Sequence, residues 1–117
     1  MIQQERGIEI FCDIHGHYCP AGDFMYCNSY DSSELNFNHS NVDREKLTDN
    51  AQLRVIPHLL AKKNKHFDIK QCTFTMEQYK AASARQVFFN EFKIKHSFTL
   101  ENSFFKKQGN DLSLSNL

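Results

Sequence analysis

Apolar and polar positions alternate along the N-terminal part of the chain. Isoleucine or cysteine stands at every second position of residues 8–14, and Glu9 and Asp13 lie between them. A repeat of two is typical of a β-strand, because successive side chains point to opposite faces of the sheet. Gly16 predicts a turn that ends this strand directly after His15.

Strand patterns return further along the chain. Residues 24–27 form a short apolar run, residues 72–76 alternate, and residues 96–101 alternate and end on the carboxylate of Glu101. Each of these three segments is therefore predicted to be a strand. The apolar segment 84–89 fits a strand or a helix, since a short apolar run has no decisive period.

A repeat of three to four residues predicts a helix in the middle of the chain. Leu47, Ala51 and Val55 recur at this spacing, and Asp43 before them is a residue type that caps helix N-termini. Pro57 is expected to break or kink the helix, because proline lacks the backbone N–H that a helix interior requires. Strands mixed with a helix indicate the α/β fold class.

The remaining segments are predicted to be loops and a tail. Residues 28–43 are rich in Asn, Ser and Asp, which predicts a surface loop. Residues 108–117 have no clear period and are predicted to be a disordered tail. With 117 residues, the chain has room for one domain or for part of a larger one.

Charge and cysteine usage narrow the class of protein. Fourteen basic and fourteen acidic side chains cancel, which argues against nucleic acid or an anionic membrane as a partner. No apolar run reaches membrane length, and the first residues lack a signal-peptide pattern. The four cysteines contain no CxxC pair, so we interpret them as reduced thiols of an intracellular, cytoplasmic protein.

Three polar residues are candidates for chemistry. His15 and Glu101 lie at the ends of two predicted strands, where α/β proteins place functional groups, and Arg85 lies between them in sequence. A histidine on a metal with a carboxylate as general base can activate water, and an arginine can bind an anionic group. Alternatively, Glu101 is a solvent-facing residue and Arg85 pairs with Glu77 or Glu91.

Five blocks of sequence, in the same order, resemble motifs of the cytosolic carboxypeptidases, which belong to the zinc carboxypeptidase family. The blocks are Phe11-Cys12-Asp13-Ile14-His15-Gly16-His17 with Phe24-Met25-Tyr26, Arg54-Val55-Ile56-Pro57-His58-Leu59-Leu60, Cys72-Thr73-Phe74, Ala84-Arg85-Gln86-Val87, and Ser97-Phe98-Thr99-Leu100-Glu101. The resemblance spans about residues 8–105. It implies that residues 1–107 are the C-terminal part of a catalytic domain with a mixed β-sheet flanked by helices.

The resemblance also implies a function. Members of this family use zinc to trim glutamate from tubulin and other proteins, so the implied substrate is a protein or peptide with an acidic C-terminal tail. His15 matches a zinc ligand of the family, and Glu101 matches the glutamate that activates the attacking water. Arg85 matches an arginine that recognises the acidic side chain of the last residue. His17 is interpreted as structural, and Tyr79 either caps the substrate or packs in the fold.

Part of the family pattern is missing from this chain. None of its six histidines is followed by glutamate three residues later, so the H-x-x-E pair of zinc ligands is absent. In the family, the H-x-x-E motif lies in the N-terminal half of the domain. The asparagine–arginine pair that binds the terminal carboxylate of the substrate lies in the same half and is also missing from this chain. The chain alone is therefore expected to have little activity and to expose an unpaired strand edge.

Two alternatives from other classes stay open. The first is a catalytically inactive fragment or pseudoenzyme that acts as a protein-interaction module. The second is a small zinc protein that uses cysteines together with His15 and His17.

Overall fold

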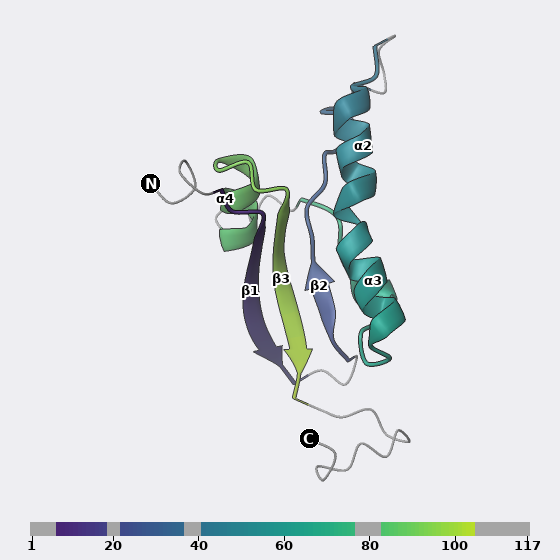
Figure 1. The fold of residues 1–117 in the computed structure, drawn as a ribbon, viewed down its shortest axis with the longest axis vertical. Coiled ribbons are helices and arrows are strands. Elements are labelled where there is room, and N and C mark those ends of the chain that lie inside the picture. Colours follow the sequence, from purple (N-terminus) through teal and green to yellow (C-terminus); the bar gives the residue numbers. More distant parts are fainter. Residues whose placement is uncertain (1–6, 19–21, 37–40, 77–82, 105–117) are drawn as a thin grey trace.

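The structure is a computed structural model, and it describes residues 7–18, 22–36, 41–76 and 83–104. In this part of the chain three strands form one sheet in the order β1-β3-β2 (Figure 1). β1 (Ile10–His17) runs parallel to β3 (His96–Ser103), and β2 (Phe24–Tyr26) runs antiparallel to the other side of β3. The mixed sheet with its helices confirms the predicted α/β class.

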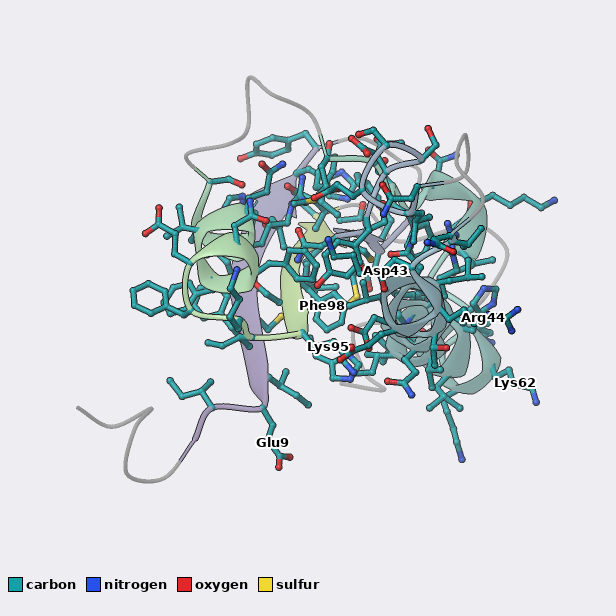
Figure 2. All side chains as sticks on the ribbon, turned by 90° about the horizontal axis from the view of Figure 1, so that it is seen from above. Glu9, Asp43, Arg44, Lys62, Lys95 and Phe98 are labelled. Carbon is teal, nitrogen blue, oxygen red and sulfur yellow. The ribbon has the colours of Figure 1, made fainter. Side chains whose placement is uncertain are left out.

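Helices lie on both faces of the sheet. α2 (Arg44–Leu53) and α3 (Val55–Lys63) cover one face, beside β2, and α4 (Ala84–Asn90) covers the other face (Figure 2). A short 3₁₀ helix, η1 (Ile69–Gln71), follows α3. None of the helices in the described ranges is both long and apolar enough to cross a bilayer.

The hydrophobic core lies between the sheet and α3. Its buried members are Met25, Cys27, Phe67 and Phe98, and Ile56 and Leu60 of α3 pack against them. Phe98 lies on the central strand and points toward the α2–α3 layer (Figure 2). Burial raises the pKa of the Cys27 thiol to about 12, so this cysteine stays protonated and packs as a small apolar residue.

The predicted helix is present but divided in two. The Asp43 side chain accepts a hydrogen bond from the backbone N–H of Lys46 and caps α2, as its position predicts. The break falls at Arg54, and Pro57 lies in the first turn of α3. Because Pro57 has no N–H and its ring crowds the carbonyl of Leu53, the helix is interrupted one turn before the proline.

The prediction that Gly16 ends the first strand is wrong. β1 continues to His17, and Gly16 pairs with Asn102 of β3. The ring of Phe104 occupies the place where a Cβ on Gly16 would lie. Glycine is therefore required here for close packing against an aromatic ring and not for a turn.

Two other segments can be compared with their predictions: residues 72–76 are predicted to be a strand, and residues 84–89 fit a strand or a helix. Residues 72–76 form no regular strand, and Thr73 makes one isolated bridge to Tyr26. The bridge consists of two backbone hydrogen bonds, from the Thr73 N–H to the Met25 carbonyl and from the Cys27 N–H to the Thr73 carbonyl. The segment 84–89, which fitted either element, is helical as α4.

The sheet leaves one apolar surface uncovered. Within the described ranges β1 pairs with β3 and with no other strand, so its outer edge is open. Ile10 and Ile14 of β1 are 57% and 65% exposed, although they lie on the face of the sheet that carries the core residue Phe98. The expected unpaired strand edge is therefore present.

We expect the free energy of unfolding to decrease as the pH falls below about 6.5, in part through His96. Burial lowers the pKa of His96, and the charge of Lys95 lowers it further, against the opposing effect of Glu9. The unfolded imidazole binds a proton more readily than the folded one, so acid favours unfolding. Denaturant unfolding at about pH 7.5 and about pH 5.5 should show a smaller acid loss for His96→Gln. An equal loss in both proteins would contradict this assignment.

Candidate functional site

The register of the sheet brings His15 and Glu101 side by side. The two residues are direct partners in the parallel pair of β1 and β3, so their side chains lie on the same face. His15 Nδ1 lies 3.5 Å from Glu101 Oε1. The His15 side chain is 50% exposed and that of Glu101 is 14% exposed, so the pair is open to solvent from the side of β1.

A second carboxylate orients the imidazole. Asp13 lies two residues before His15 on the same face of β1, and His15 Nε2 donates a hydrogen bond of 3.0 Å to Asp13 Oδ2. An imidazole held by a carboxylate through one nitrogen is the usual arrangement of a metal-binding histidine, whose other nitrogen is the ligand. The local geometry therefore suits His15 as a single ligand.

A pocket of about 340 Å³ opens beside this pair. It is lined by His15, Tyr26, Ser83, Arg85, Thr99 and Glu101. The structure thus brings the three residues singled out from the sequence into one cavity, although 86 positions separate the first from the last in the chain. Their roles in binding or catalysis stay predictions.

Sequence reasoning assigned no role to the other three lining residues. Thr99 could have been found, since it lies two residues before Glu101 on β3 and strand periodicity places both on one face. Tyr26 reaches the pocket because β2 pairs it with Thr99. Ser83 arrives as the residue before α4. No pattern in the sequence predicts that Tyr26 or Ser83 lies in the pocket.

Arg85 is buried in the wall of the pocket. Its side chain is 1% exposed, and Nη1 donates to the carbonyl of Cys27 at 2.7 Å and to Asn28 Oδ1 at 2.9 Å. The hydroxyl of Ser97 in turn donates to the Arg85 carbonyl at 2.7 Å. Arg85 therefore connects α4 to the end of β2 and to β3. Glu77, one of its alternative partners, lies outside the described residues.

Replacing Arg85 with methionine should lower the free energy of unfolding by about 2–3 kcal/mol. The buried carbonyl of Cys27 and the amide oxygen of Asn28 would each lose a donor. Chemical denaturation followed by circular dichroism would measure the change. The matched control is Arg44→Met, at the exposed start of α2, with an expected change within about 0.5 kcal/mol. Equal effects in the two variants would show that the guanidinium does not brace the fold.

Two secondary predictions of the sequence have different outcomes. His17 Nε2 donates to the carbonyl of Gly22 at 2.9 Å, and its ring lies 5.1 Å from that of Phe24. These contacts fit the structural role expected for His17. Tyr79 lies outside the described residues, so its role as a substrate cap stays a prediction.

A complete zinc site is not formed by the described residues. No three histidine, cysteine or carboxylate side chains among them are grouped closely enough to hold a metal ion. A catalytic zinc ion needs three protein ligands and one open position. His15 can supply one ligand, so the described part of the chain does not fit a catalytic zinc ion by itself. The cysteines of this part also form no metal-binding cluster with His15 and His17.

Comparison with known proteins identifies relatives of this chain. The chain is 30% identical over 99 residues to mouse "Cytosolic carboxypeptidase 4" and 32% identical over 96 residues to zebrafish "Cytosolic carboxypeptidase 1". It is also 30% identical over 108 residues to bovine "Cytosolic carboxypeptidase-like protein 5". No protein-family model matches the chain.

These matches cover most of this chain but little of each relative. They extend over 80–85% of the chain and over 8–11% of the relatives' lengths. The resemblance to cytosolic carboxypeptidases is therefore confirmed, and the described α/β fragment is compatible with part of such a domain.

Proposed function

From the similarity of this chain to one stretch of the cytosolic carboxypeptidases, we propose that it forms part of a zinc-dependent carboxypeptidase site. The reaction is the removal of C-terminal residues, mainly glutamate, from acidic protein tails such as those of tubulin. The observation that carries the proposal is the shared pocket of His15, Arg85 and Glu101. His15 is proposed as one zinc ligand, with the other protein ligands supplied from outside the described residues.

Glu101 is proposed as the general base. A carboxylate beside the scissile peptide takes a proton from the attacking water and returns it to the nitrogen of the leaving residue. Glu101 is suited to this role because its side chain is partly shielded at the pocket wall and lies next to His15. The strands hold both groups, so their relative position is preorganised.

Arg85 is proposed to recognise the acidic side chain of the substrate. Arg85 is one of the residues that line the pocket, and the hydrogen bonds from its Nη1 to Cys27 and Asn28 hold the guanidinium in place. A cation that is already ordered loses less entropy on binding an anion, which supports a preference for glutamate over neutral residues. In keeping with the relatives' names, we propose that the protein acts in the cytosol, without a nucleic-acid or membrane partner.

Grafting tests this proposal. Residues 8–105 would replace the matching stretch of the mouse relative, and release of glutamate from a peptide with a polyglutamate C-terminus would be measured. We expect the graft to release glutamate and to lose this activity with a chelator. The control graft carries His15→Ala, which removes the proposed ligand. A folded graft without activity would contradict the proposal.

A second candidate function is an inactive interaction module, and the absence of a three-ligand metal group in the described residues favours it. Zinc titration of the chain by itself addresses this alternative. With His15 as a single ligand, we expect no stoichiometric binding at sub-micromolar zinc. Stoichiometric binding at that concentration would argue against the inactive module. The grafting experiment then distinguishes a chain that lacks only the remaining zinc ligands from a chain that is inactive even when those ligands are supplied.

A further inference from the structure

Asn28 is a buried polar residue that the sequence analysis did not single out. It is the first residue of the segment predicted to be a surface loop, yet it is only 1% exposed. Burying a side-chain amide is costly unless its donor and acceptor groups are paired. The partners of this amide therefore show what Asn28 holds together.

A closed ring of hydrogen bonds links Asn28, Arg85 and Ser97. Arg85 Nη1 donates to Asn28 Oδ1 at 2.9 Å, and Asn28 Nδ2 donates to the carbonyl of Ser97 at 2.7 Å. The hydroxyl of Ser97 donates to the carbonyl of Arg85 at 2.7 Å, which completes the ring. All three residues are at most 1% exposed, so water does not compete for these bonds.

The ring fixes the direction in which the amide of Asn28 faces. A guanidinium has only donors and a carbonyl has only acceptors, and asparagine carries one acceptor and one donor group side by side. In the opposite orientation its NH₂ group would face the guanidinium of Arg85, and its oxygen would face the carbonyl of Ser97. The observed orientation is therefore strongly favoured, and it holds the guanidinium in one place.

The ring also connects the guanidinium to the strand that carries Glu101. Ser97 and Glu101 lie four residues apart on β3, so their side chains lie on the same face of the sheet. Arg85 and Glu101 both line the pocket. The position of one relative to the other is thus set by the backbone of β3 and the amide of Asn28, and less by the freedom of a long arginine side chain.

We propose that Asn28 is the positioning residue that gives this site its preference for a C-terminal glutamate. It acts through Arg85, whose guanidinium is held where it meets the carboxylate of the substrate side chain. This inference rests on the proposed function and deepens it. A purely structural role predicts an equal loss of activity on all substrates, whereas a positioning role predicts a loss for acidic residues alone.

Two variants of Asn28 in the graft test this role. Leucine removes both hydrogen bonds of the amide, and Asn28→Asp keeps the size of the side chain but pairs its own charge with the guanidinium. The ratio of kcat/KM for release of glutamate over glutamine should fall about tenfold or more in both variants, with the rate on glutamine nearly unchanged. The matched control, Asn90→Leu at the exposed end of α4, should leave the ratio unchanged. A ratio equal to that of the parent graft, or an equal loss on both peptides, would overturn the proposal.

A binding measurement on the chain itself separates this inference from the peptidase activity. Glutarate carries the carboxylate of a glutamate side chain, and glutaramide is its neutral counterpart. Glutarate, and not glutaramide, should shift the NMR signal of the Arg85 Nε–H, and Asn28→Asp should weaken this binding about tenfold or more. An inactive graft would contradict the proposed function, and the glutarate titration would still decide the role of Asn28. No shift in the parent chain, or equal binding by the variant, would overturn the inference.

Discussion

Glu101→Gln in the grafted protein is expected to lower kcat by about a thousandfold, within the range for a lost general base. The amide keeps the size of the side chain but cannot take a proton from water. Glu101 lies near the C-terminal end of the central strand and outside the hydrophobic core, so the fold should be retained. Initial rates of glutamate release, with circular dichroism as the check on folding, would measure the effect.

The shape of the kinetic change separates catalysis from binding. Loss of a proton acceptor should lower kcat and leave KM nearly unchanged, because the substrate contacts remain. The matched control is Glu91→Gln, at the exposed C-terminal cap of α4, with an expected rate equal to that of the parent graft. If Glu101→Gln released glutamate as fast as the parent, the assignment of the base would be wrong.

Phe98→Ala should lower the free energy of unfolding by about 3–5 kcal/mol, the usual cost of deleting a buried ring. Phe98 is 1% exposed on the central strand, where it packs with Met25, Cys27 and Phe67. Small domains have a total stability of about 5–15 kcal/mol, so the variant should be marginally folded. Urea unfolding followed by circular dichroism is suited to the measurement, because the chain contains no tryptophan.

A second phenylalanine provides the control. Phe92 is 42% exposed after α4, so the same truncation there should cost about 1 kcal/mol or less. Similar losses at positions 92 and 98 would indicate that the layer between the sheet and α3 is not the main core. A much larger loss at Phe98 would support the central position of β3 in the fold.

Much of the fold could be predicted from local patterns. Alternation located β1 and β3, a short apolar run located β2, and the helical repeat with Asp43 located the start of α2. These features depend on neighbours within a few positions, which a sequence displays directly. The prediction that Gly16 ends the strand failed because the outcome depends on a residue that is distant in sequence. The ring of Phe104, 88 positions away, replaces the missing side chain and lets the strand continue.

For the candidate site, too, the sequence indicates some features and the tertiary structure decides others. The sequence by itself indicated which residues are candidates for chemistry, His15, Arg85 and Glu101, and it carried the resemblance to cytosolic carboxypeptidases that the relatives confirm. Only the tertiary structure decided that β1 lies parallel to β3 in the register that sets His15 beside Glu101. It also decided that Arg85 is buried as a brace between α4 and the residues that follow β2. Strand order and register arise from contacts between distant segments, and no local pattern in the chain specifies them.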